Sequence, residues 1–154
     1  MVHTSCSIGG EALKVKEIMS KRVIGVGAEE SVEVAARSLA QYNVGALPVC
    51  TTNGKLCGMV TDRDLVTRCL ASGMQPSQTK VSQVMTPGVV SVDGDMDVSV
   101  AAHLMGRKQI RRLAVTENGR LCGMISLGDL AIREDCAIDA ADALGDIARN
   151  ITDG

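Results

Sequence analysis

The chain has 154 residues, a net charge of −2 and a mean hydropathy of +0.15. This length suits one compact domain or two small units that share a core. Charges of both signs are spread along the chain, which argues against the basic patch of a nucleic-acid-binding protein. There is one Tyr and no Phe or Trp. The core must therefore be aliphatic, and the aromatic platform on which single-stranded bases stack is missing.

The N-terminal residues and the cysteines bear on the compartment. MVHTSCSIGG lacks the charged-then-apolar layout of a signal peptide. No apolar run approaches ~18 residues, so no membrane span is expected. The cysteines show no C-x-x-C spacing and no neighbouring His cluster, and most lie in apolar runs, where Cys behaves as a small buried hydrophobe. We expect no metal site and predict a reduced, cytoplasmic protein. The cysteines are Cys6, Cys50, Cys57, Cys69, Cys122 and Cys136.

After an N-terminal segment (1–14), residues 15–71 predict a β-α-β-β-α unit, here called the first copy. VIGV (23–26) is a β-branched run typical of a strand, and apolar residues at helical spacing predict a helix after Ser31, a suitable N-cap. ALPVC and LCGMVT predict two strands. They are joined by TTNGK, whose Asn-Gly pair is a strong hairpin signal. DRDLVTRCLA predicts the closing helix.

Residues 72–80, SGMQPSQTK, are polar, contain Gly and Pro, and predict a linker. Residues 81–135, the second copy, repeat the first at an offset of 66, and then of 65 after one deletion. VSQVM lies over VKEIM, and GRLCGMISLGDL lies over GKLCGMVTDRDL. VVSV (89–92) and RLAVT predict strands, and Asp97 is the expected N-cap of the second long helix. In each copy the helical crossover predicts a parallel strand pair, and the Asn-Gly turn predicts an antiparallel pair.

A copy of ~55 residues buries too little surface to be stable alone, so the two copies are expected to pack together. The predicted fold class is α/β (α+β): tandem β-α-β-β-α repeats packed sheet to sheet as a pseudo-two-fold pair. The tail, residues 136–154, carries apolar residues at helical spacing, with Asp139 and Asp142 as a possible cap. We expect an amphipathic helix that packs on its own module; the alternative is a helix that reaches a partner.

The repeated motifs together resemble a cystathionine-β-synthase (CBS) domain pair, or Bateman module. The resemblance covers about residues 15–135. It is carried by the V-x-x-[IV]-M opening of each copy, by NVGALPV and QIRRLAV, and by the pattern G-h-x-[TS]-x-x-D (h, apolar) in GMVTDRD (58–64) and GMISLGD (123–129). The chain is similar to small stand-alone bacterial two-CBS proteins. The resemblance implies a disk-like homodimer, and a cleft between the copies with two candidate nucleotide sites.

The resemblance also implies the site residues. The Thr or Ser of the pattern would contact phosphate and the Asp would hold the ribose hydroxyls, which selects Thr61 with Asp64 and Ser126 with Asp129. The base would lie against the segments before the second strand of each copy. These are Ala46, Leu47 and Pro48 in the first copy, and Arg112, Leu113 and Ala114 in the second.

Each of these residues has a purely structural alternative. A hydroxyl at a helix start suits a phosphate, and a carboxylate three residues later suits a ribose diol. The same spacing is also a capping box with Asp in place of Glu, which needs no ligand. Arg63 either reaches a phosphate or lies in solvent. Arg111 and Arg112, which replace Gly45 and Ala46 of the first copy, either neutralise phosphates or form salt bridges.

Two glycines of the repeated pattern, Gly58 and Gly123, are expected to allow the close approach of backbone or ligand.

We expect no enzyme, because the sequence has no Ser/His/Asp set, no paired carboxylates and no phosphate-cradling loop, and His3 and His103 lie in unrelated settings. The first hypothesis is a regulatory ligand-sensing module, with no obligatory cofactor, read by an unknown protein partner. Its ligand would be AMP, ADP, ATP, S-adenosylmethionine or NAD, bound in the cleft. The alternative is a ligand-free module for dimerisation or partner docking. A redox role is disfavoured, because Cys57 and Cys122 occupy matching strand positions, as duplicated core packing requires.

Overall fold

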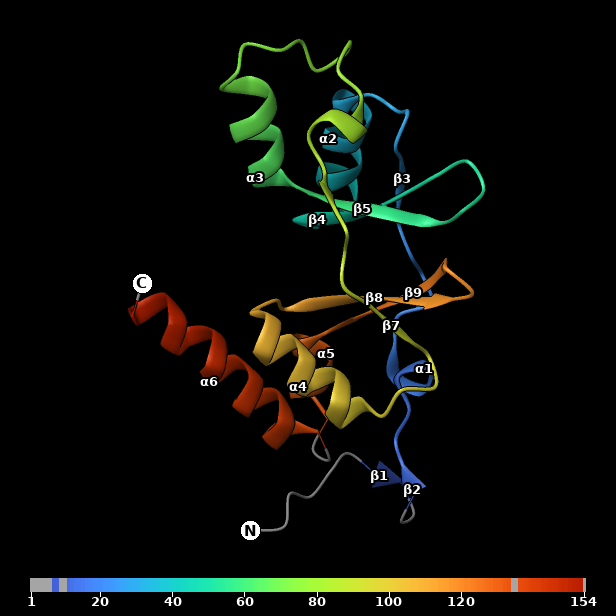
Figure 1. Ribbon diagram of the computed structural model, residues 1–154, viewed down its shortest axis with the longest axis vertical. Coiled ribbons are helices and arrows are strands. Elements are labelled where there is room, and N and C mark those ends of the chain that lie inside the picture. The colour runs from blue at the N-terminus through green and yellow to red at the C-terminus, as the bar shows by residue number, and fades with distance from the viewer. Residues whose placement is uncertain (1–6, 9–10, 134–135, 154) are drawn as a thin grey trace. The chain divides into compact units, whose positions relative to one another are not determined.

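The computed structural model describes residues 7–8, 11–133 and 136–153, and these form two compact units (Figure 1). The central unit consists of Val23–Val89 together with Asn118–Leu121. The flanking unit consists of the chain up to Arg22, Val90–Glu117 and the chain from Cys122 onward. His3 and Cys6 lie outside the described residues.

The central unit is a sheet with helices on one side. Its elements are β3 (Val26–Gly27), α2 (Val32–Tyr42), β4 (Ala46–Cys50), β5 (Leu56–Thr61), α3 (Asp62–Asp64), the π-helix η1 (Leu65–Leu70), the 3₁₀ helix η2 (Val81–Gln83) and β6 (Thr86–Pro87). The strand order is β3-β4-β5-β6, with β3 parallel to β4 and the other pairs antiparallel. The predicted alternation of parallel and antiparallel pairs is confirmed here. The first strand is shorter than the predicted run 23–26.

The flanking unit repeats this plan and adds a helix. Its elements are β1 (Ser7–Ile8), β2 (Glu11–Ala12), α1 (Val15–Ile18), β7 (Ser91–Asp93), α4 (Val98–Lys108), β8 (Arg112–Glu117), β9 (Arg120–Ser126), α5 (Leu127–Ala131) and α6 (Ala137–Asp153). The sheet order is β7-β8-β9, and β7 is parallel to β8. Helix α6 packs on α4 and α5 (Figure 1). The tail therefore packs on its own module, as predicted.

The helix termini follow the sequence in part. The Ser31 hydroxyl accepts a hydrogen bond from the Val34 N–H at 3.2 Å, so the predicted cap is confirmed. Asp97 holds the N-cap position of α4, but its side chain makes no capping hydrogen bond. Helix α6 begins at Ala137, so Asp139 lies inside its first turn and the predicted cap at that residue is wrong.

Each unit has its own aliphatic core. The central core is formed by α2, β4, β5 and η1, and it includes Leu47, Val49 and Val60, all fully buried. The flanking core extends from the sheet through α4 to α6, where Ala143 and Ile147 are buried. Within the described part of the chain, no helix combines the length and apolar character needed to cross a membrane.

The opening segment of each copy packs in the unit built mainly from the other copy. In the flanking unit the Val15 N–H donates to the Met96 carbonyl at 2.9 Å, and Ser20 pairs with Met124 of β9. In the central unit the Val81 N–H donates to the Glu30 carbonyl at 2.8 Å. Residues 15 and 96 correspond to 81 and 30 at the repeat offset of 66, so the two arrangements are reciprocal. The compact units therefore cross the boundaries of the sequence repeats.

This exchange explains the glycines of the repeated pattern. A Cβ on Gly123 would meet the Met19 thioether and lie 3.1 Å from the Ser20 carbonyl oxygen. A Cβ on Gly58 would meet the Met85 thioether and lie 3.0 Å from the Thr86 carbonyl oxygen. The predicted close approach is thus made by backbone and by the methionine that ends each V-x-x-[IV]-M opening, and not by a ligand.

A third glycine, Gly106 on α4, brings α6 close. A Cβ at this position would lie 2.9 Å from the Ala143 Cα and 3.1 Å from Asp146 Oδ2. Real Cβ atoms do not approach backbone so closely, so the absence of a side chain at Gly106 sets the spacing of the two helices.

Candidate functional site

In the central unit, the hydroxyl and carboxylate of the repeated pattern form a reciprocal box at the end of β5. The Asp64 N–H donates to Thr61 Oγ1 at 3.1 Å, and the Thr61 N–H donates to Asp64 Oδ2 at 3.0 Å. The box is fixed to the preceding segment because the Asp62 N–H donates to the Gly45 carbonyl at 3.0 Å. Capping therefore occurs at this position, as the structural alternative predicted.

The flanking unit repeats this box at the end of β9. The Asp129 N–H donates to Ser126 Oγ at 3.1 Å, and the Ser126 N–H donates to Asp129 Oδ2 at 3.1 Å. The Leu127 N–H donates to the Arg111 carbonyl at 3.0 Å, which matches the bond to Gly45 in the first copy. In both boxes one carboxylate oxygen, Oδ1, is not used by the cap.

The two boxes differ in what surrounds this second oxygen. Arg68 Nε lies 3.7 Å from Asp64 Oδ1, and the Arg68 guanidinium also donates to the carbonyls of Val84 and Met85 at 3.1 and 3.2 Å. Through Arg68, Asp64 is thus linked to the opening segment of the second copy. The Asp64 side chain is only 14% exposed. Asp129 makes no ion pair with a described residue. The second carboxylate oxygen of Asp129 is therefore freer to bind a ligand than that of Asp64, which lies near Arg68.

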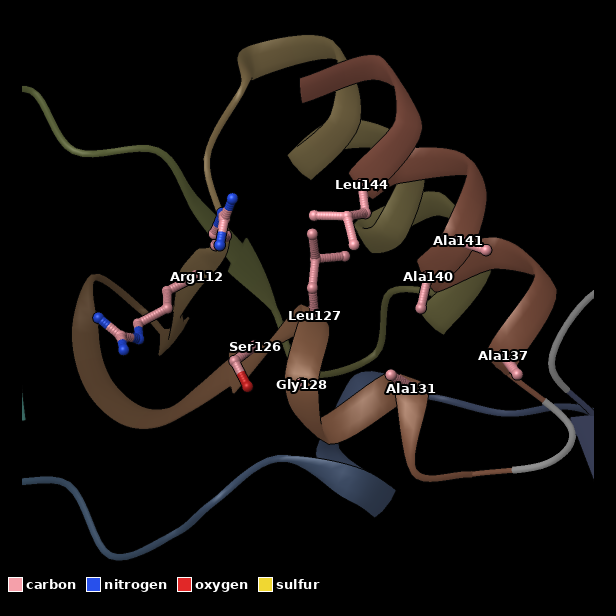
Figure 2. Close-up of a pocket in the computed structure, with 10 residues that line it drawn as sticks. Arg112, Ser126, Leu127, Gly128, Ala131, Ala137, Ala140, Ala141 and Leu144 are labelled. Atoms are coloured by element: carbon pink, nitrogen blue, oxygen red, sulfur yellow. The ribbon is translucent and has the colours of Figure 1, made fainter. Parts of the chain in front are cut away.

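A pocket of about 490 Å³ adjoins Ser126 within the flanking unit (Figure 2). It is lined by Arg111 and Arg112 before and at the start of β8, by Ser126, by one side of α5 and by α6. Figure 2 shows Arg112 and Ser126 on one side of the pocket, the α6 alanines on the other, and Leu127 and Leu144 directed toward each other between them. Its volume falls within the range of small-molecule sites.

The arginines of the second copy lie where a ligand could meet them. Both side chains are exposed, and neither forms a hydrogen bond or salt bridge with a described residue. A surface salt bridge of Arg111 or Arg112 is therefore absent from the described part of the chain, and an interface salt bridge stays a prediction. Arg63 of the first copy is also exposed, which keeps open both predictions for it.

The predicted base-binding segments lie in β4 and β8, and their contact with a base stays a prediction. Leu47, Leu113 and Ala114 are fully buried, and the two leucines belong to the cores of their units. In each strand three consecutive residues are buried, so strand alternation alone does not account for the burial. Ala46 is half-buried and Pro48 is buried, so Ala46 and Arg112 are the more accessible members of the predicted set.

Helix α6 supplies lining residues that the sequence did not reveal as site residues. These are Ala137, Ala140, Ala141 and Leu144. Their spacing predicts a helix, but the pattern of small and apolar residues is equally typical of a packing face. The tail also lies outside the repeat, so the comparison of the two copies carries no information about it.

The cysteines behave mainly as packing residues. Cys57 Sγ donates to the Val49 carbonyl at 3.3 Å, and Cys122 Sγ donates to the Val115 carbonyl at 3.4 Å, so the matching positions pack alike. Among the described residues, no group of three or more His, Cys, Asp or Glu side chains could hold a metal ion. Cys136 is fully buried and disulfide-bonded, so the expectation of reduced thiols throughout does not hold for it.

The free thiols are expected to be unreactive at neutral pH. Burial raises the pKa of the thiols of Cys50, Cys57 and Cys122. Since the thiolate is the reacting form, a raised pKa moves the onset of alkylation to higher pH. Peptide-level mass spectrometry of iodoacetamide labelling between pH 7 and 10 should show this displacement, relative to the same peptides after digestion. Coincident pH profiles for folded protein and free peptides would contradict it.

Comparison with known proteins agrees with these features. The family model of the CBS domain matches residues 15–71 and 81–133. The CBS domain-containing protein YhcV of Bacillus subtilis is 40% identical over 134 residues, which are 87% of this chain and 94% of YhcV.

Two solved structures are also similar. The CBS domain pair of protein MJ0100, in complex with 5′-methylthioadenosine and S-adenosyl-L-methionine, shares 27% identity, with 79% of this chain and 94% of that chain covered and a TM-score of 0.68. CBSX2 in complex with AMP shares 30% identity, with 75% of this chain and 91% of that chain covered and a TM-score of 0.66. The reciprocal repeat, its two hydroxyl–carboxylate boxes and these matches lead to one conclusion: the chain belongs to the CBS-domain family and carries a tandem pair of CBS domains.

Proposed function

We propose that the protein is a regulatory module that senses an adenine nucleotide or a related adenosyl ligand. The observation that carries the proposal is the pocket beside Ser126, which is lined by a hydroxyl and two unpaired guanidinium groups. Asp129, whose Oδ1 the cap does not use, is bonded to Ser126 but lies outside the lining. Arg111 and Arg112 would hold phosphate, since guanidinium groups match phosphate geometry and retain their charge. Asp129 would accept hydrogen bonds from the ribose hydroxyls.

The similar structures support the ligand class. MJ0100 is bound to 5′-methylthioadenosine and S-adenosyl-L-methionine, and CBSX2 is bound to AMP. Adenosine is common to these ligands. A ribose contact from the carboxylate would serve each of them, and the arginines would favour those with phosphate. Thr61 and Asp64 remain the proposed second site, with Arg63 beside them. Because Arg68 engages Asp64, we expect the Ser126 site to bind more tightly.

Isothermal titration calorimetry with AMP tests the proposal. An Asp129→Asn variant keeps an oxygen that can accept the Ser126 N–H but loses the charge, and it should weaken AMP binding about tenfold. Removing the ribose hydroxyls, as in 2′,3′-dideoxy-AMP, should weaken binding to the natural protein but cause little further loss in Asp129→Asn. Equal losses in both proteins would show that Asp129 does not contact the ribose.

The arginines have a matched control on α4. Arg111→Ala with Arg112→Ala should weaken AMP binding more than adenosine binding. Arg107→Ala with Lys108→Ala removes the same charge from exposed positions that do not line the pocket. If both double variants weaken AMP equally, the effect is one of net charge and the site assignment fails.

The alternative of a ligand-free docking module is tested by a thermal-shift panel. A ligand at ~100 times its dissociation constant should stabilise the protein by about 2.7 kcal/mol. No shift with AMP, ADP, ATP, S-adenosylmethionine or NADH at millimolar concentration would favour the alternative. CBS domains are generally regulatory and not catalytic, and the matches reported above indicate no enzyme family. The homodimer, the inter-copy cleft, the protein partner and the cytoplasmic location stay predictions.

A further inference from the structure

The pocket extends from Ser126 to the side away from Asp129. At about 100° per residue, Leu127, Gly128 and Ala131 share an arc of α5 about 100° wide. All three line the pocket, whereas Asp129 lies outside this arc and does not line it. A ligand whose ribose lies at Asp129 and whose phosphate lies at Ser126 would therefore leave most of the pocket empty.

The remaining space is chemically divided. Its rim carries Arg111, Arg112 and the Ser126 hydroxyl, and the rest of its lining is aliphatic or glycine. No carboxylate is among its ten lining residues. The rim therefore suits an anion and disfavours a cation. The wall of α5 and α6 offers no side-chain hydrogen bond, so it suits an apolar group.

The aliphatic wall is firmly held. Ala140 and Ile147 of α6 are buried in the flanking core, and Ala143 packs against Gly106 with no room for a side chain between the helices. Ala141 and Leu144 project from the same helix into the pocket lining and are exposed. A wall that is already in place orders few groups when a ligand binds, which favours affinity.

The first copy lacks these features. Gly45 and Ala46 replace the two arginines, and Ala36 and Ala40 of α2 are exposed where the corresponding Ala102 and Gly106 of α4 are covered. Helix α6 belongs to the flanking unit, where it packs on α4 and α5. The extended pocket is therefore a property of the second copy.

We infer that the pocket beside Ser126 takes a nucleoside 5′-phosphodiester: a nucleotide whose phosphate carries an additional, apolar group that lies against α6. The inference rests on the proposed function, because it uses Ser126, Arg111 and Arg112 as the phosphate site. Ala141 and Leu144 are then specificity-determining residues. Esterification leaves one negative charge on the phosphate, which the arginines still neutralise. The apolar ester group would pack against the aliphatic residues of α5 and α6.

Calorimetry with AMP and with its phosphate hexyl ester tests this inference. The natural protein should bind the ester at least tenfold more tightly than AMP, since burial of six methylene-sized groups outweighs the loss of one phosphate charge. An Ala141→Phe variant fills the pocket, and the ester should then bind no more tightly than AMP. Asp142→Phe places the same ring on the next residue, which is exposed and does not line the pocket, and the tenfold preference should persist.

The outcomes separate the two proposals. If AMP binds but the ester binds equally or more weakly, the phosphodiester inference fails and the proposed function stands. If the preference survives Ala141→Phe, the apolar group does not lie against α6 and the inference is again overturned. If neither compound binds, the proposed function fails and the inference falls with it.

Discussion

Replacing Gly106 by leucine is expected to lower the free energy of unfolding by about 2 to 3 kcal/mol. A Cβ at this position would already lie 2.9 Å from the Ala143 Cα, and helix backbone cannot yield as a side chain can. The variant must therefore push α6 away from α4 and expose part of the flanking core. The gain in helix propensity over glycine, about 0.8 kcal/mol, offsets only part of this cost. Urea unfolding followed by circular dichroism measures the change.

The duplicated chain provides a matched control. Ala40 occupies the same position on α2 and is exposed, so Ala40→Leu should change the stability by less than about 0.5 kcal/mol. A loss in Ala40→Leu as large as in Gly106→Leu would show that the helix face, and not the contact with α6, determines the cost. Because α6 lines the pocket, Gly106→Leu should also weaken binding of the hexyl ester of AMP.

Placing alanine at position 123 is expected to destabilise the protein by about 2 kcal/mol. The new methyl group would meet the Met19 thioether and the Ser20 carbonyl. The methionine can be removed without touching the backbone, so Met19→Ala should relieve part of the clash. Met19→Ala alone is also destabilising, since Met19 packs against the flanking core.

A double-mutant cycle separates these effects. The double variant Met19→Ala, Gly123→Ala should be more stable than the sum of the single changes predicts, by about 1 kcal/mol. Gly58 and Met85 form the corresponding pair in the central unit and should show the same sign of coupling. Strict additivity in both pairs would mean that glycine is needed at these positions for another reason, such as close approach of the backbone alone.

Much of the fold follows from local patterns. The Asn-Gly turns, the apolar spacing of the long helices and the cap at Ser31 are encoded by neighbouring residues, and the structure agrees with them. The reciprocal exchange of the openings was not predictable. The sequences VKEIM and VSQVM fit either sheet, and only long-range packing decides which glycine each methionine meets. The repeat offset gives the period of the chain but not the partner of each segment.

The candidate site was predictable to a similar extent. The spacing of Ser126 and Asp129 predicts both a cap and a binding pair, and the cap is what the structure shows directly. Leu47 belongs to the aliphatic core of its unit, and its contact with a base stays a prediction. The contribution of α6 could not be foreseen, because the identity of the wall depends on how the tail folds back. The arginines that replace Gly45 and Ala46 were the informative difference between the copies.

The reciprocal openings also bear on how such a chain can arise. A single copy with this fold would lack the segment that fills the space beside its own glycine, because that segment always comes from the other copy. Two separate single-copy chains could fill this space only by forming a dimer in which each chain packs its opening segment beside the glycine of the other. The present protein thus corresponds to two single-copy chains that exchange their opening segments and are joined covalently by the linker at residues 72–80. Because of the linker, the exchange takes place within one chain and needs no encounter between two chains. Cutting that linker should leave two pieces that are soluble together and incomplete apart.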